Sequence, residues 1–438
     1  MKILWALIVL AGLALEIGYL PRALLARNLS TLKYLTIVIM SQNMLAALSN
    51  LVFPSFLSQV IILFKEVILY GVVVLSLLFD DKPVPTAMAR CNMVLIGLFI
   101  IYFFVGEASL YTKLVCFRQI MTPVILLLYG RSLWLTRADV KEYCKFLVSL
   151  CVFQALFGLM ERFVFQDEFW RTINVASLME SKGMGAWVFD NGLPGNYYSA
   201  DFYDLLGINI RRLVGFTTDP LLTAHFIAFG AVIVLYDYSF KKLGLLILMG
   251  IAILLTISKG AILVVGFVVW YWIWRRSKTA ALILLIPVVA VLGYVISRNT
   301  LGSVAIHFSG FLSGFNSNSL LGSGLGTVGN YATLSGSNIN ATGESFVAAL
   351  MGQMGIPGIV GFFCLFICYL KEMKKHNPGE QAYAVFSYIV AVFLESLMSE
   401  SAINYVGSGI AFIVLGLLSQ PLPDPNPESY EKSIHLPQ

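Results

Sequence analysis

The chain has 438 residues, of which 58% are hydrophobic and 12% are charged, and its mean hydropathy is +0.82. Because soluble proteins carry about 25% charged residues, this composition excludes a soluble enzyme and a disordered protein. The net charge of +5 does not indicate a nucleic-acid partner, since an excess of Lys and Arg in a membrane protein mainly sets its topology. We therefore expect an all-α integral membrane protein, a polytopic helix bundle in a lipid bilayer.

Thirteen apolar stretches predict the helices of this bundle, because a membrane span takes about 20 apolar residues. In chain order they lie at 3–20, 33–52, 56–79, 92–108, 114–130, 145–165, 220–238, 243–257, 260–274, 279–297, 346–370, 381–397 and 402–419. Glu16 interrupts the first stretch, so we expect about 12–13 transmembrane helices, with the first segment re-entrant or interfacial in the smaller count. The six cysteines lie within or beside apolar runs and form no CxxC motif, so we interpret them as packing thiols, not disulfides or metal ligands.

Two stretches between the spans are long and polar enough to lie outside the membrane. The last stretch of the chain is Pro-rich and has no apolar period, which is typical of a disordered tail. The predicted organisation is N-terminal transmembrane helices (1–165), a first long loop (166–219), central transmembrane helices (220–297), a second long loop (298–345), C-terminal transmembrane helices (346–420) and a disordered tail (421–438).

The distribution of Lys and Arg predicts which side faces the cytoplasm. One set of loops holds 18 of the 29 basic residues, the opposite set, with both long loops, holds nine, and Lys65 and Arg118 lie inside spans. Because cytoplasmic loops carry the excess of Lys and Arg, we expect the tail in the cytoplasm and both long loops on the outer side. No nucleotide-binding, HExxH or GxSxG motif occurs in the sequence, so we expect no cofactor and no metal, and chemistry at the outer face.

Ionisable residues inside spans are candidates for function, because each costs at least about 2.5–3.5 kcal/mol at the centre of the membrane. Lys65 lies close to mid-membrane, and its neighbour Glu66 should point in a different direction, so we expect no mutual neutralisation. Lys65 then forms an ion pair with another helix or contacts an anion within the bundle. Arg118 lies about one turn below the outer surface, where it either snorkels as an anchor or binds a lipid phosphate.

The sequence RRLVGFTTDP closes the first long loop and opens the next span. Arg211 and Arg212 offer planar forks of donors that match a phosphate, although both could also be anchors at the membrane surface. Asp219 and Pro220 read as a helix N-cap followed by proline at the first helical position. Lys259, in LLTISKGAILVVG, sits at the outer interface as an anchor or as a second cation for the same anion.

The second long loop and the helix after it carry the acid–base candidates. Arg298 and His307 precede the glycine-rich stretch LLGSGLGTVGN. A histidine with a pKa near 6.5 suits proton transfer, but a hydrogen-bonded loop histidine is the alternative. Thr342 reads as the N-cap of the next helix, which would place Glu344 in its first turn. There the carboxylate could act as a general base, or it could only interact favourably with the positive end of the helix dipole.

The first long loop interleaves aromatic and acidic residues, an arrangement that often holds sugar rings, although Trp and Tyr also gather at membrane interfaces without a function. The aromatic residues are Phe165, Phe169, Trp170, Trp187, Phe189, Tyr197, Tyr198, Phe202 and Tyr203. Several cations, one carboxylate and aromatic loops at one face would suit a phosphate-headed lipid that bears a sugar.

These pieces in this order resemble the O-antigen polymerase and ligase superfamily (Wzy and WaaL types), which are bacterial membrane glycosyltransferases with a GT-C-like fold. The resemblance covers about 211–361, through RRLVGFTTDP, TISKGA, LLGSGLGTVGN and GESFVAALMGQMGIPG. The family's RxxG arginine falls on Arg212, and its Ser-Arg-Gly falls on Ser258–Gly260, with Lys259 in place of Arg. Ligases carry a His-Asn pair where this chain has Glu344 and Ser345, and this departure favours a polymerase.

The resemblance implies a reaction and its participants. The donor would be a glycan on undecaprenyl pyrophosphate, the acceptor a sugar hydroxyl of a second lipid-linked repeat unit, and no metal would be needed. It implies Glu344 as base with His307 as rival, and pyrophosphate contacts from Arg118, Arg212, Lys259 and either Arg211 or Arg298, beside the intramembrane Lys65. Such an enzyme would work in the bacterial inner membrane, facing the periplasm, with a flippase and a chain-length regulator.

Two alternatives stay open. A ligase would move the same donor glycan to lipid A core or to a protein, and only the residues at Glu344 argue against it. A lipid-linked oligosaccharide transporter is the alternative from another class; such carriers often show internal repeats, and none is evident in the sequence.

Overall fold

The structure is a computed structural model, and the part it describes begins at Lys2 and ends at Pro423, with gaps. The described residues are 2–79, 84–182, 184–185, 188–199, 207–237, 242–297, 311–312, 320–329, 332 and 345–423. Each of the thirteen predicted apolar stretches coincides with a helix. These are α1 (Lys2–Ala26), α2 (Leu29–Asn50), α3 (Ser55–Phe79), α4 (Thr86–Phe104), α5 (Leu110–Ser132), α6 (Arg137–Met160), α10 (Pro220–Tyr236), α11 (Lys242–Thr256), α12 (Lys259–Arg276), α13 (Lys278–Ser297), α16 (Phe346–His376), α17 (Glu380–Ser396) and α18 (Gly409–Leu418).

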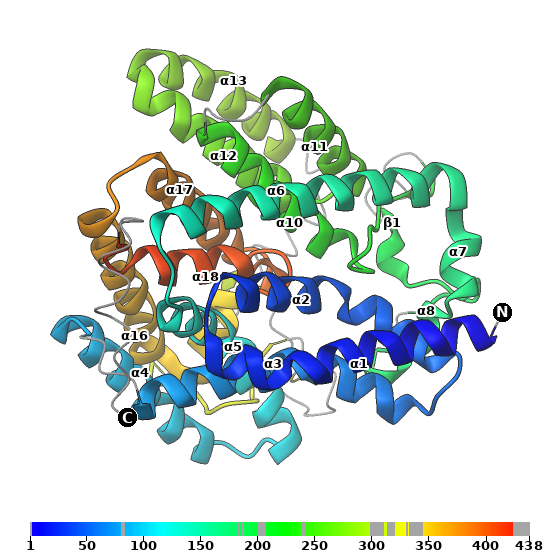
Figure 1. The fold of residues 1–438 in the computed structure, drawn as a ribbon. Helices are drawn as coiled ribbons and strands as arrows, with labels where there is room; N and C mark the ends of the chain where they lie inside the picture. Colours follow the sequence, from blue (N-terminus) through cyan, green and yellow to red (C-terminus); the bar gives the residue numbers. More distant parts are fainter. Residues whose placement is uncertain are drawn as a thin grey trace.

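Six of the described helical segments are long and apolar enough to cross a membrane, and four more are apolar but only 10–17 residues long. The chain is therefore an all-α polytopic membrane protein; the exact number of spans stays a prediction. The first candidate, Ile3–Ala26, contains Glu16 and is the least buried of the six. In Figure 1, α1, α2 and α6 run along one another toward the end of the molecule where α7, α8 and β1 lie.

Helix boundaries follow the capping residues of the sequence. The side chain of Asp219 accepts hydrogen bonds from the backbone N–H groups of Leu221 and Leu222 at 2.8 and 3.0 Å, and Pro220 is the first residue of α10. This confirms the predicted N-cap. By contrast, α18 begins at Gly409 and not at 402, because polar side chains there bond to their own backbone: Asn404 Oδ1 accepts from Gly407 N at 2.6 Å.

The helix ends separate into two groups of loops, as the distribution of Lys and Arg predicts. At one end the backbone N–H of Trp134 donates to Arg27 O at 2.9 Å, Gln420 Nε2 donates to Leu133 O at 3.1 Å, and Arg275 pairs with Glu380. These residues belong to the Lys- and Arg-rich loops, and we call this end the basic end. The opposite end carries the first long loop, and we call it the loop end.

The first long loop is folded onto the bundle. It follows a π-helical turn (Glu161–Phe165) and contains α7 (Gln166–Thr172), α8 (Val175–Ser181) and a short antiparallel pair, β1 (Tyr198–Ser199) and β2 (Ile210–Arg211). Trp170 and Tyr197 are fully buried in a hydrophobic cluster with residues of α1, α2 and α3. The described part of this loop thereby covers the loop end of these helices.

The described part of the second long loop forms hydrogen bonds with the backbone of α16 where this helix is interrupted. Gly355 has a non-helical backbone (φ 63°, ψ −162°), and Pro357 cannot donate a hydrogen bond. Segment 320–329 supplies the missing partners: Ser323 N donates to Gly352 O, Gly324 N to Gln353 O, and Ile356 N to Leu320 O, all at 2.9 Å. Residues 324–329 are buried, so this part of the second long loop packs against the bundle at the break in α16.

Close helix contacts rely on glycines where backbones touch. On α5, a Cβ at Gly130 would collide with the carbonyl of Ile413 on α18, and a Cβ at Gly416 on α18 would collide with the carbonyl of Leu127. Small residues at membrane helix interfaces allow such approach. The α5–α18 contact therefore fixes α5, which carries Arg118, in the centre of the bundle.

Candidate functional site

Three cations from separate elements meet near the loop end, and only one described acidic side chain forms an ion pair with any of them. Glu66 Oε1 on α3 lies 3.5 Å from Lys65 Nζ and also 3.5 Å from NH1 of Arg118 on α5. Lys182, directly after α8, is close enough to Lys65 and Arg118 for its charge to act on both. We call Lys65, Arg118 and Lys182 the cation cluster.

The ion pair between Lys65 and Glu66 corrects the expectation that these neighbours cannot neutralise each other. The expectation concerned the directions in which adjacent side chains leave a helix. The long Lys65 side chain curls back instead, so that its Nζ donates to Ile62 O at 2.7 Å, and Arg118 draws the Glu66 carboxylate toward the same point. Glu66 Oε1 itself is buried and accepts no hydrogen bond among the described residues.

Lys182, the third member of the cation cluster, lies in the first long loop. Lys182 Nζ donates to Asn43 Oδ1 on α2 at 3.0 Å, and Asn43 Nδ2 donates to Thr217 O at 3.1 Å. Burial, together with the positive charge of Arg118 and against the opposing effect of Asp219, lowers the pKa of Lys182 to about 8. The loop end of α2, the first long loop and the turn before α10 are joined at this lysine.

The cation cluster has the properties of an anion site. With Glu66 ionised and all three cations protonated, the four groups carry a net charge of +2 in partly buried surroundings. Lys65 is 2% exposed, whereas the Arg118 side chain is 37% exposed and can reach a ligand. The ring of Tyr405 lies 4.8 Å from Lys65 Nζ and covers it from the side of the 399–408 loop. Asp219 offsets part of the charge of Lys182. Because uncompensated buried charge is costly, an anion would complete the site.

Arg211 is held by carboxylates of the protein. Its NH2 donates to Glu161 Oε2 at 2.7 Å, and its Nε donates to Asp167 Oδ1 at 2.6 Å. Glu161 is fully buried and also accepts from Trp170 Nε1 at 2.8 Å and Val214 N at 2.7 Å. These contacts favour a structural role for Arg211, and pyrophosphate binding by it stays a prediction.

Arg212 and Lys259 come together at the turn between α11 and α12. Arg212 Nε donates to Thr256 O at 2.7 Å, and its NH2 donates to Ile257 O at 3.4 Å. These are carbonyls at the end of α11, where a cation is favourable. Lys259 opens α12 two residues later and is exposed. The structure thus groups the two residues at this turn.

Arg298, His307 and Glu344 lie outside the described residues, but the start of α16 corrects one expectation. Ser345 is the N-cap, its Oγ accepting from Ala348 N at 3.1 Å, so Thr342 is not the cap and Glu344 does not fall in the first turn. Ser345 Oγ also donates to Ser396 O at 3.4 Å. The residue next to Glu344 is therefore fixed against the end of α17.

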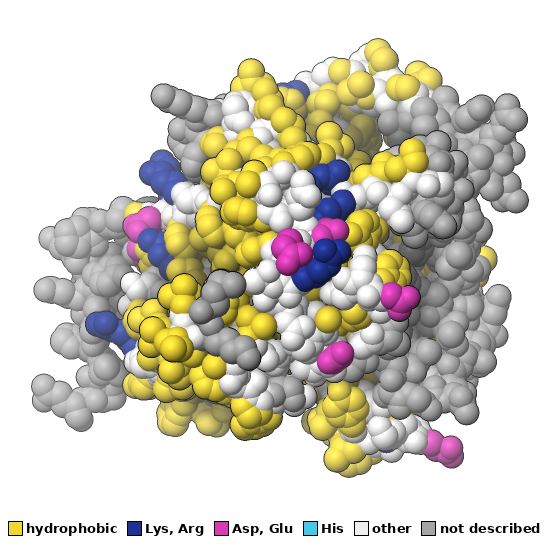
Figure 2. Space-filling view, turned by 90° about the vertical axis from the view of Figure 1, so that its right-hand side faces the viewer, with side chains coloured by type: hydrophobic (Ala, Val, Ile, Leu, Met, Phe, Trp, Pro, Cys, Tyr) yellow, Lys and Arg dark blue, Asp and Glu magenta, His cyan; other side chains and the backbone are white. Residues whose placement is uncertain are grey.

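The first-loop aromatics divide into packing residues and surface residues. Trp170 stacks edge to face with Phe169 and Tyr197 at 5.0 and 5.4 Å between ring centroids, so these rings build the core of the loop and not a sugar platform. Tyr198 donates to Asp167, and burial, followed by this hydrogen bond, raises its pKa to about 12. Phe189 is 54% exposed. Figure 2 shows the side of the molecule that is on the right in Figure 1. Acidic and basic side chains gather near its middle, with hydrophobic side chains around them.

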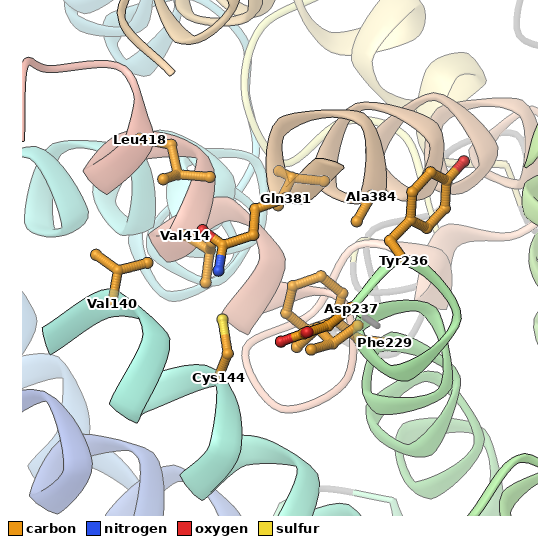
Figure 3. A pocket seen from close by; sticks show the side chains of 11 residues that line it. Val140, Cys144, Phe229, Tyr236, Asp237, Gln381, Ala384, Val414 and Leu418 are labelled. Carbon is orange, nitrogen blue, oxygen red and sulfur yellow. The ribbon is translucent and has the colours of Figure 1, made fainter. Parts of the chain in front are cut away.

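The pocket in Figure 3 lies away from these residues. It is almost wholly apolar and is lined by α6, α10, α17 and α18, with Asp237 and Gln381 as its polar members. Gln381 is the second residue of α17, and Asp237 directly follows α10, which places the pocket toward the basic end. It therefore does not belong to the polar site at the loop end.

Three buried acidic residues were not predicted from the sequence, although each is an ionisable residue in or beside an apolar stretch. Glu161, Glu395 and Glu400 are 0, 7 and 4% exposed and stand in or beside apolar runs. The rule that singled out Lys65, an ionisable residue in an apolar stretch, applies to them equally. Lys182 gave no such signal, because its surroundings in the sequence read as a surface loop.

No family model matches the chain, and no curated protein is significantly similar to it. Among the described residues, no group of three or more His, Cys, Asp or Glu side chains could hold a metal ion.

Proposed function

We propose that the chain is a bacterial polysaccharide polymerase, a glycosyltransferase of the inner membrane that acts at its periplasmic face. It would transfer a glycan from undecaprenyl pyrophosphate to a sugar hydroxyl of another lipid-linked repeat unit. The observation that carries the proposal is the cation cluster, because Lys65, Arg118 and Lys182 supply excess positive charge in a partly buried site of a membrane protein.

The charge of the cluster fits the leaving group of this reaction. The acceptor oxygen forms a bond to the anomeric carbon, and the bond from that carbon to the diphosphate oxygen breaks with its electron pair going to the diphosphate. Positive charge fixed in advance where this negative charge develops lowers the barrier. Arg118 would contact the diphosphate directly since it is the most exposed of the Lys65–Arg118–Glu66 group.

The proton of the attacking hydroxyl must pass to a base. We assign this role to Glu344, with His307 as the rival. Support comes from Ser345, which follows Glu344 and is fixed to Ser396 O, since Glu395, next to Ser396, packs against Gly260 beside Lys259. The backbone of Ser345 thus approaches Gly260, the neighbour of Lys259, which the resemblance also assigns to the pyrophosphate.

The test is a reaction with the purified full chain in detergent. Lipid-diphosphate-linked repeat units are incubated without nucleotide and with EDTA, and the products are resolved as a gel ladder. We expect the wild type to form a ladder, and Arg118→Ala and Glu344→Gln to lose it while staying folded. Arg171→Ala is the matched control, because Arg171 is an exposed arginine at the same end. A folded Arg118→Ala variant with wild-type activity would contradict the proposal.

The same assay separates the two alternatives. Transfer of the glycan only after lipid A core is added would identify a ligase. Uptake of the lipid-linked oligosaccharide across vesicles without any new glycosidic bond would identify a transporter.

A further inference from the structure

A histidine and a glutamate without a role assigned above face each other inside the bundle, beside the first turn of α12. His225 on α10 and Glu395 on α17 are 1% and 7% exposed, and His225 Nε2 lies 2.7 Å from Glu395 Oε2. His225 Nδ1 lies 2.8 Å from Leu221 O. A carbonyl oxygen only accepts, so Nδ1 carries a hydrogen. One further proton then occupies the contact between Nε2 and Oε2, and the pair is neutral as a whole.

The pair joins four parts of the chain. Tyr388 OH donates to His225 O at 2.9 Å, and a Cβ at Gly407 would lie 2.6 Å from the Cβ of His225. On the other side, a Cβ at Gly260 would collide with the Glu395 carboxylate and lie 3.2 Å from its Cγ. The carboxylate therefore occupies the space that glycine leaves in the first turn of α12.

This first turn begins with Lys259, so the place of the Lys259 backbone depends on Glu395. Ser258 caps the turn through its side chain, but that bond fixes only the start of the helix and not its distance from α17. A buried polar pair is weak evidence for stability, because apolar residues of the same volume are often as stable. The contact of Glu395 with Gly260 points instead to a role in placing the charged residue beside it.

We propose that Glu395, held by His225, is a positioning residue that sets the first turn of α12 and with it the Lys259 side chain against the anionic head of the donor. The role of Lys259 as an anion contact rests on the proposed function. The steric fit of Glu395 against Gly260 does not depend on the proposed function.

The first experiment measures the position of residue 259 without any substrate. Lys259→Cys is labelled with a water-soluble maleimide in the full chain, alone and combined with Glu395→Ala or Glu395→Gln. We expect Glu395→Ala to change the labelling rate at least about threefold. Glu395→Gln keeps the volume and a hydrogen bond to His225, so its rate should stay near the parent rate. Equal labelling in all three proteins overturns the proposal whatever the chain catalyses.

The second experiment measures the Michaelis constant for the lipid-linked donor. We expect Glu395→Ala to raise it about fivefold to tenfold in the wild type and not at all in a Lys259→Ala background, because residues that act through each other are not additive. Effects that simply multiply would overturn the proposal, as would a folded Glu395→Gln variant as impaired as Glu395→Ala, which would assign the pair a charge or proton role. A wild type without activity would refute the proposed function and leave the labelling result to decide the position of residue 259.

Discussion

Replacing Glu161 by Gln should destabilise the chain by about 3–5 kcal/mol, although the two side chains have the same shape. One carboxylate oxygen accepts from Trp170 Nε1 and Arg211 NH2, and the other accepts from Val214 N at 2.7 Å and Gly215 N at 3.4 Å. The amide NH2 of Gln cannot accept, so one pair of donors loses its acceptor. Hydrogen bonds to a charged group contribute about 1.5–3 kcal/mol each, and removing one partner of a buried ion pair costs about as much as the two together.

The magnitude translates into a measurable shift in the unfolding temperature. With an unfolding entropy of about 2.1 cal/mol/K per residue, a chain of 438 residues loses about 1 °C for each kcal/mol. We expect a decrease of about 3–5 °C for Glu161→Gln in detergent, followed by intrinsic fluorescence. Cleavage of the first long loop by protease should also become faster, because Glu161 ties β2 and the turn before α10 to the end of α6.

Glu168→Gln is the matched control, since Glu168 lies seven residues further on and its side chain is 78% exposed. Its unfolding temperature should stay within about 0.5 °C of the wild type. If Glu161→Gln unfolds at the wild-type temperature and its loop resists protease as before, the assignment of Glu161 as the central anchor of the loop is wrong.

Three further predictions follow from the site and the fold. Because the pKa of Lys182 is lowered to about 8, its positive charge is lost as the pH rises through that value, so kcat/KM for the donor should fall above pH 8; Lys182→Arg keeps its charge and should remove this decrease, and an unchanged pH profile in Lys182→Arg would contradict the assignment. Arg118→Lys should raise the donor KM by about tenfold, because the bidentate fork is lost and the charge remains; equal KM values would remove Arg118 from the site. Gly324→Ala should lower the free energy of unfolding by about 2 kcal/mol, and with it the unfolding temperature, because Gly324 has a φ of +100° and a Cβ there would collide with the backbone of Val105. Wild-type stability would contradict the packing of segment 320–329.

The positions of the helices could be predicted from the sequence, because the membrane requirement for apolar runs leaves a strong signal. The local backbone details that shape the site could not be predicted from the sequence. The π-helical turn at Glu161 and the late start of α18 at Gly409 depend on which partner each polar group finds in the folded chain. The hydropathy of residues 161–165 and 402–408 alone does not reveal those partners.

The candidate site was predicted in part. Lys65 and Arg118 stood out because charge is costly in a membrane, and the structure brings both to one carboxylate. Their convergence with Lys182 depends on how α8 packs against α2 and α3, a long-range contact without any sequence pattern. The same holds for His225 and Glu395, which are 170 residues apart in the chain.

The hydrogen bonds between segment 320–329 and α16 have a consequence for the connection between α13 and α16. Loop-closure entropy depends on the length between fixed points, and the hydrogen bonds to Gly352 and Gln353 create fixed points within this connection. What the sequence presents as a single long connection is therefore divided, because its described segment 320–329 is bonded to α16. This segment behaves as a part of the helix bundle and not as a part of a loop.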